Sequence, residues 1–288
     1  MNTDVLSTRQ VATLLGVGEA TVKRWADAGE IDCFRTPGGH RKFRLRDVTA
    51  FVQRRQYEAA GPLPMAVAQG AVEVGEEAIQ HFLDASLRGD AAALVAQLAG
   101  LRLRGHSLAE LFDEVATPAL QRIGEQWAQA KLSVAEEHVS SQSVIDALAR
   151  AQPLAEPPGE PVRPDRGTAI VAAVAGELHD IGARMCACLL RAQGFEVLAP
   201  LAQTPARDLH DLILRSRASV VALSSTMDAD VGEQLAMSIA ATQQTGGRVL
   251  VGGEGMRKAR LPDEVKLLAS LRELEAESQT AGRRRARA

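Results

Sequence analysis

The chain has 288 residues, of which 46% are hydrophobic and 24% charged, so it is long enough for two or three domains with sizeable cores. No apolar run reaches the roughly 18 residues that a membrane helix needs, and the first residues lack the pattern of a secretory signal. The three cysteines, Cys33, Cys186 and Cys188, do not have the spacing of a disulfide framework or a zinc site. We therefore expect a protein of the reducing cytoplasm that has neither a membrane span nor structural disulfides.

The first 55 residues are basic, with eight arginines and two lysines against six acidic residues. Ser7 and Gln10 form a capping-box pattern that predicts a helix start. After a turn at 16–18, a second helix over 19–28 carries Thr21, Lys23 and Arg24 on its outer face. Two short helices joined by a tight turn predict a helix-turn-helix, whose second helix can enter a major groove.

A Pro-Gly-Gly turn at 37–39 separates two extended basic arms and predicts a hairpin wing, followed by a third helix over 45–55. Residues 5–55 resemble the winged-helix DNA-binding domain of MerR-type regulators. The alternative interpretation is a basic, solvated surface on a small helical domain. The resemblance implies base contacts from the second helix, further contacts from the wing, and phosphate contacts around both. The implied residues are, in that order, Thr21 and Arg24; His40 and Arg41; and Lys23, Arg35 and Arg44.

Periodic apolar residues predict a helical region after a linker at 56–70. Its four segments cover 72–87, 91–102, 108–128 and 134–151, and the short connections favour an antiparallel four-helix bundle. Pro118 is expected to kink the third segment. A second linker over 152–166 holds five prolines. The predicted domains are 1–58, 71–152 and 166–278, followed by a basic, disordered tail at 279–288.

The third domain is predicted to alternate strands with helices, which favours a parallel sheet covered on both faces, a Rossmann-like (flavodoxin-like) α/β fold. The predicted strands are 168–174, 195–199, 219–223, 248–251 and 265–269. The predicted helices are 183–192, 205–216, 231–244 and 271–278. The absence of a Gly-x-Gly-x-x-Gly fingerprint after the first strand argues against dinucleotide binding.

Three polar or glycine-rich segments follow strands of this sheet and therefore share its carboxyl edge, where ligands bind. The first contains Glu177, His179, Asp180 and Gly182. Forty-one residues separate Gly182 from Ser224, which begins Ser224-Ser225-Thr226, and twenty-five residues separate Thr226 from Gly252-Gly253. Alone, His179 has the features of an ordinary polar loop residue. With a carboxylate from Glu177 or Asp180 to hold one ring nitrogen, it has the features of a metal ligand.

This spacing resembles the cobalamin-binding domain of methionine synthase and the corrinoid mutases, whose motif is Asp-x-His-x-x-Gly, then Ser-x-Leu, then Gly-Gly. Here Glu177 replaces the Asp and Thr226 replaces the Leu. The resemblance implies that His179 binds cobalt from below. It also implies that the nucleotide tail of the cofactor runs past Ser224 and the Gly252-Gly253 turn.

The helical region contains Trp127, nine further residues, and then Glu137-His138. A tryptophan near a helix end is commonly a core residue, and Glu137-His138 could be solvated or could cap the next helix. The spacing nevertheless resembles the Trp-x9-Glu-His signature of the CarH and LitR class of adenosylcobalamin-dependent, light-responsive repressors. The resemblance implies that Trp127 and Glu137 contact the adenosyl group and that His138 helps hold the upper face of the corrin. One departure is Ala128, where the characterised photoreceptors have a histidine.

The expected function is therefore that of a cobalamin-dependent transcriptional repressor without enzymatic activity. Adenosylcobalamin would drive assembly into a homo-oligomer, a tetramer in the related repressors, that binds a double-stranded DNA operator until light releases it. A light-independent cobalamin sensor is the first alternative. The others are a corrinoid methyltransferase-type protein and a DNA-binding regulator whose α/β domain holds a different ligand or none.

Overall fold

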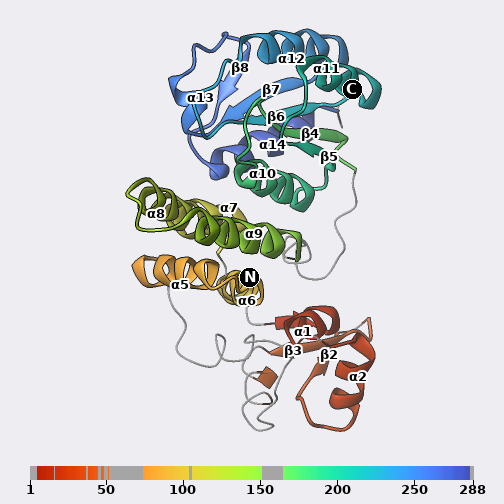
Figure 1. Ribbon diagram of the computed structural model, residues 1–288. Coiled ribbons are helices and arrows are strands. Elements are labelled where there is room, and N and C mark those ends of the chain that lie inside the picture. Colours follow the sequence, from red (N-terminus) through yellow and green to blue (C-terminus); the bar gives the residue numbers. More distant parts are fainter. Residues whose placement is uncertain are drawn as a thin grey trace. The chain divides into compact units, whose positions relative to one another are not determined.

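The structure is a computed structural model that describes residues 5–15, 17–36, 38–44, 47–48, 51, 74–103, 106–150 and 165–285. It divides into two units, Met1–Glu160 and Pro161–Ala288 (Figure 1). The first unit contains the basic amino-terminal domain and the helical region, and each part is described by itself below. The predicted linkers at 56–70 and 152–166 lie outside the described residues, apart from Asp165 and Arg166.

The amino-terminal domain combines two helices with a small antiparallel sheet, of order β1-β3-β2 within the described residues. The elements are β1 (Val5–Ser7), α1 (Thr8–Leu14), α2 (Glu19–Asp27), β2 (Phe34–Arg35) and β3 (Arg41–Arg44). The predicted capping box is present, because Ser7 N–H donates to Gln10 Oε1 at 2.7 Å and Gln10 N–H donates to Ser7 Oγ at 3.3 Å. Strand β1 was not anticipated from the sequence. The third helix predicted over 45–55 falls mostly outside the described residues.

The helical region has the four predicted segments, and the described helices pack against one another. They are α5 (Glu76–Leu87), α6 (Ala91–Leu103), the composite third segment, and α9 (Val134–Arg150). The third segment consists of α7 (Leu108–Leu111), a π-helical turn η1 (Phe112–Ala116) and α8 (Thr117–Ala128). Ser107 begins this segment and Ser133 begins α9, and in each case a glutamate three residues later completes a capping box. At Ser133 the partner is Glu136, so Glu137 is left for another role.

Pro118 is accommodated at the first turn of α8, directly after the π-helical turn. The Thr117 N–H donates to Phe112 O, five residues back, instead of four. Because proline has no N–H to donate, the wider turn before it removes the clash that would arise in a regular α-helix. The predicted kink thus takes the form of a π-bulge.

The carboxyl-terminal domain is a parallel sheet of order β5-β4-β6-β7-β8 within the described residues. Its strands are β4 (Thr168–Ala173), β5 (Glu196–Leu201), β6 (Val220–Ser224), β7 (Arg248–Gly252) and β8 (Val265–Leu267). This order has a switch point between β4 and β6, the place where flavodoxin-like sheets bind ligands. The predicted α/β fold is confirmed.

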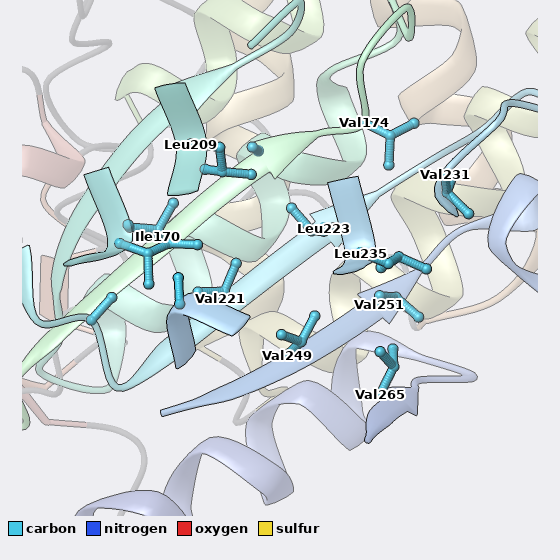
Figure 2. Packing of buried hydrophobic residues seen from close by; sticks show 14 of the residues in the cluster. Ile170, Val174, Leu209, Val221, Leu223, Val231, Leu235, Val249, Val251 and Val265 are labelled. Atoms are coloured by element: carbon cyan, nitrogen blue, oxygen red, sulfur yellow. The ribbon is translucent and has the colours of Figure 1, made fainter. Parts of the chain in front are cut away.

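Helices cover both faces of this sheet (Figure 1). They are α10 (Ile181–Ala192), α11 (Ala206–Ser216), α12 (Gly232–Thr245), α13 (Glu254–Lys258) and α14 (Leu271–Arg285). Helices α10 and α14 pack together on one face, and α11 packs against α12 on the other. Figure 2 shows the apolar side chains between the sheet and α11 and α12, among them Ile170, Val221 and Leu235.

Two features of this domain differ from the sequence prediction. Helix α14 runs to Arg285, so residues 279–285 of the tail that was expected to be disordered are helical. Its alanine, arginine and glutamate residues are good helix formers, and the helix is anchored because Arg166 Nη2 donates to Ser278 O at 2.7 Å. The short helix α13 was not predicted. No described helix has the length and apolarity that crossing a membrane requires.

Candidate ligand site and nucleic-acid interface

The β4 loop, residues 175–180, is organised around the buried carboxylate of Glu177. Glu177 Oε1 accepts from the backbone N–H of His179 at 2.8 Å and bonds its ring Nδ1 at 2.6 Å. Oε2 accepts from the N–H groups of Thr226 and Met227 at 2.7 and 2.8 Å. One side chain therefore joins the loop after β4 to the loop after β6.

These hydrogen bonds also determine the charge of Glu177. Burial alone would raise the pKa of this carboxyl group. The N–H groups of Met227, His179 and Thr226, together with the imidazole of His179, more than offset burial and hold the pKa below its ordinary value. Glu177 is thus an ionised acceptor at neutral pH, which is the state that orients a neighbouring imidazole.

His179 has the geometry of a metal ligand whose ring is oriented by a carboxylate. With Nδ1 donating to Glu177, the neutral ring carries its lone pair on Nε2. The side chain is 58% exposed, so Nε2 is accessible from outside the domain. Of the two carboxylates that the sequence offered, the structure selects Glu177. Asp180 instead forms a two-point ion pair with Arg184, at 2.9 and 2.7 Å.

The other two sequence landmarks join this loop at the same sheet edge. Val174 N–H donates to Ser224 O, and Ser225 N–H donates to Gly252 O. A Cβ at Gly182 would lie 3.0 Å from Ser224 Oγ, which explains the small residue there. The structure therefore brings together Glu177, His179, Gly182, Ser224, Thr226, Gly252 and Gly253.

The two adjacent glycines differ in the space around them. Gly253 has φ +99°, and an added Cβ would lie 2.2 Å from Ser225 O, so the chain itself requires glycine here. At Gly252 the nearest atom to an added Cβ is Leu268 O at 3.8 Å. The geometry of the chain itself thus accounts for glycine at 253 and does not account for glycine at 252.

Two exposed apolar side chains beside His179 were missed by sequence reasoning. Leu178 is 67% exposed and Met227 is 58% exposed, although both are large and hydrophobic. Their neighbours are tightly held, since Glu177 binds both Met227 N–H and His179 N–H. Exposed apolar side chains on the same two loops as an exposed imidazole suit a largely apolar ligand.

The donor set narrows the kind of metal centre that could form. No cluster of three or more histidine, cysteine, aspartate or glutamate side chains fit to hold a metal ion occurs among the described residues. His179 offers one imidazole nitrogen. A metal bound there must bring most of its other ligands with it, as cobalt does within a corrin ring, so the residues present fit cobalamin.

The residues of interest in the helical region lie at one end of α8 and α9. Trp127 continues the buried stripe of Ala119 and Ile123 but is 50% exposed, so it is not a core residue. Glu137 Oε1 accepts from Ser141 Oγ at 2.5 Å, and its Oε2 lies 3.7 Å from His138 Nε2. His138 itself is exposed. The structure thus leaves an accessible aromatic ring, a carboxylate and an imidazole on two helices that contact each other.

In the amino-terminal domain, most of the predicted DNA-contacting residues reach solvent. Lys23, Arg24, Arg35, His40 and Arg44 are exposed, and Thr21 is partly exposed. Arg44 lies 5.8 Å from the ring centre of the exposed Phe34. Arg41 is different, because its side chain is only 18% exposed and pairs with Asp27 Oδ1 at 2.5 Å. Arg41 therefore links the wing to the end of α2.

Three parts of the chain match models of known protein families. Residues 5–56 match a model described as a helix-turn-helix domain, and residues 78–152 and 167–261 match two models each described as a B12 binding domain. The chain is thus of the class that combines a helix-turn-helix domain with B12-binding domains.

Two curated relatives are transcriptional repressors by name. The chain is 28% identical over 242 residues to the HTH-type transcriptional repressor CarH of Myxococcus xanthus, covering 74% of this chain and 76% of that one. It is 42% identical over 69 residues to the transcriptional repressor DcmR of Methylorubrum extorquens, which is 24% of each chain. The fold is similar to a monomethylamine corrinoid protein of Methanosarcina barkeri (TM-score 0.55, 14% identity, covering 71% of this chain and 98% of that one). The chain is thus similar in sequence to CarH over most of its length, and similar in fold to a corrinoid protein.

Proposed function

We propose that this protein is a cobalamin-dependent transcriptional repressor. The observation that carries the proposal is the Glu177–His179 pair, held ready at the switch point of a B12-binding domain in a chain that also has a helix-turn-helix domain. The similarity to two repressors over different shares of the chain supports the same conclusion.

In this proposal His179 Nε2 would hold the cobalt of cobalamin, and Glu177 would fix the imidazole ring through Nδ1. Leu178 and Met227 would contact the corrin, and Ser224 and Gly252 would help to hold the nucleotide tail. Thr226, Gly182 and Gly253 shape the loops, and Asp180 holds Arg184 at the start of α10. Trp127, Glu137 and His138 would contribute to binding the adenosyl group. When bound, adenosylcobalamin supplies a cobalt–carbon bond that light can break.

The same proposal assigns DNA binding to α2 and the wing. Thr21 and Arg24 would read bases in the major groove, while Lys23, Arg35 and Arg44 contact phosphates and His40 extends the contact from the wing. Cobalamin binding would favour a homo-oligomer, a tetramer by analogy with the related repressors. Several linked DNA-binding domains bind repeated operator sites more tightly than one, because each later contact is intramolecular.

A second candidate is a cobalamin sensor that does not depend on light. The observation that favours it is Ala128, which directly follows Trp127, is exposed and has no ligating atom. In a light-responsive protein, by contrast, His138 or water would have to take the place of the missing histidine after light. A corrinoid methyltransferase-type role is the third candidate, supported by the fold alone. The helix-turn-helix domain has no function in such a protein, so we propose that the chain is not an enzyme.

The test is size-exclusion chromatography with absorbance detection after adenosylcobalamin is added in the dark, repeated after green light. Co-elution with a larger species that light reverses supports the photoreceptor proposal. Assembly that survives light supports the light-independent sensor. A chain that retains no cobalamin contradicts both.

A further inference from the structure

Gln234 is a buried polar residue on the first turn of α12 that the proposed site does not use. Its side chain is only 2% exposed, and its Oε1 accepts from the backbone N–H of Ala175 at 2.6 Å. Its Nε2 is buried and has no hydrogen-bond partner in the structure. Burying an amide with one group unsatisfied is costly. The one hydrogen bond that Gln234 makes must therefore contribute something else.

Ala175 lies at the beginning of the β4 loop. Before it, Val174 N–H donates to Ser224 O, and after it Glu177 N–H donates to Val174 O at 3.0 Å across a turn that contains Gly176 at φ +84°. The later part of the loop is held by the Glu177 carboxylate, which accepts hydrogen bonds from Thr226 and Met227. Gln234 fixes the beginning of the loop at Ala175, so both parts of the loop are hydrogen-bonded to the segment 224–234.

The packing around Gln234 does not call for a polar side chain. The neighbours of Gln234 on α12, Val231 and Leu235, are buried in the apolar core of the domain, so an apolar side chain at 234 would suit the packing. Ala175 is exposed, and its N–H would be hydrated by water if the amide were absent. An apolar residue would also remove the unsatisfied nitrogen. What the amide adds is order in the loop that carries His179.

We propose that Gln234 is a positioning residue for the ligand site. By holding Ala175, it fixes the β4 loop in the conformation that presents His179 Nε2 before any ligand is bound. This inference rests on the proposed cobalamin function, because the ligand that benefits is the one His179 would bind.

The test uses the full-length chain with Gln234→Met, which keeps the length of the side chain and removes the acceptor. Amide hydrogen exchange at Ala175 and His179, measured by NMR without cobalamin, is expected to become faster at both positions. Cobalamin affinity, from an absorbance titration that also reports histidine ligation, is expected to weaken by about tenfold, as for other groups that orient a metal ligand.

Two further variants separate positioning from packing. Gln234→Glu keeps an acceptor oxygen, so exchange at Ala175 and His179 is expected to stay close to wild type and affinity to fall by less than about threefold. Ser238→Ala removes another buried, unpartnered polar atom one turn further along α12 and is expected to change neither quantity.

Faster exchange at Ala175 alone, with wild-type exchange at His179 and wild-type affinity, would overturn the inference. If Gln234→Met does not fold, Gln234→Ala, which also removes the acceptor, takes its place, and wild-type exchange at His179 together with wild-type affinity again overturns the inference. If the wild-type chain retains no cobalamin, the proposed function fails. Exchange at His179 then still shows whether Gln234 holds the loop.

Discussion

The two candidate ligand surfaces differ in how firmly their residues are held. In the β4 loop, Glu177 is buried and bonded to four N–H groups, and His179 is fixed through both its backbone and its ring. At the end of the helical region, Trp127 and His138 are exposed, and the charged partner nearest His138 lies 3.7 Å away. The first surface thus has its imidazole fixed by hydrogen bonds to a buried carboxylate, whereas the second presents an exposed ring and an exposed imidazole.

This difference suggests that the two surfaces have different roles in ligand binding. A site organised during folding loses little conformational freedom on binding, so it contributes affinity. A surface whose side chains order only on binding adds less affinity, but it responds to what is bound. In the proposed repressor, the β4 loop would retain cobalamin of any form, and the Trp127 surface would distinguish one upper ligand from another.

The largest effect is expected from His179→Ala, which removes the proposed cobalt ligand. Affinity for cobalamin should fall by more than about 100-fold, since loss of an orienting partner alone costs about 10- to 100-fold. The absorbance change that reports histidine ligation should disappear. His210→Ala, on α11 where His210 pairs with Asp211, is the matched control. Wild-type affinity in His179→Ala would contradict the assignment of the lower ligand.

Glu177→Gln comes next, because it keeps the shape of the side chain while placing an NH₂ group opposite N–H donors. The apo domain should lose about 1–3 kcal/mol of stability, the usual effect of leaving buried groups unsatisfied. Cobalamin affinity should fall by about 10- to 100-fold. Urea unfolding and an absorbance titration measure the two effects. An unchanged titration would show that Glu177 serves the fold and has no influence on His179.

The same carboxylate predicts a pH dependence. The folded pKa of Glu177 lies below its unfolded value. Its contribution to stability is therefore present above the unfolded pKa and is lost as the pH falls through the folded pKa. The difference in unfolding free energy between wild type and Glu177→Gln should shrink across that acidic window. A constant difference down to pH values below the folded pKa would contradict an ionised carboxylate.

Features that depend on local sequence could be predicted, whereas features that depend on contacts between distant residues could not. The parallel strands were predictable because their residues are almost continuously apolar, and parallel topology alone brings Gly176–Gly182, Ser224 and Gly252 to one edge. Which carboxylate holds His179 was not predictable, because Glu177 is selected by N–H groups 49 and 50 residues away. The exposure of Leu178 and Met227 depends on the same distant bonds. The helical extent of α14 was missed because its charge pattern was given more weight than its helix-forming residues.

The Gly252-Gly253 turn offers a smaller but sharper test. Gly253→Ala should destabilise the apo domain by about 1–3 kcal/mol, because the added Cβ meets Ser225 O at 2.2 Å and φ is +99°. Gly252→Ala, its matched control, has room for a methyl group and should leave apo stability within about 0.5 kcal/mol. If the cofactor passes Gly252, that variant should nevertheless bind cobalamin less tightly. Equal stability losses in the two variants would contradict the different reasons given for the two glycines.

The smallest effects are expected at Trp127, and they test most directly how the Trp127 surface differs from the β4 loop. Trp127→Ala should change apo stability by no more than about 0.5 kcal/mol, as the ring is half exposed. Affinity for adenosylcobalamin should fall by roughly twofold to tenfold, the range of aromatic packing terms, whereas affinity for hydroxocobalamin should not change. Gln121→Ala, an exposed position on α8, is the control. Equal losses for both cobalamins would mean that Trp127 contributes general affinity, and the proposed division between a retaining and a discriminating surface would then be wrong.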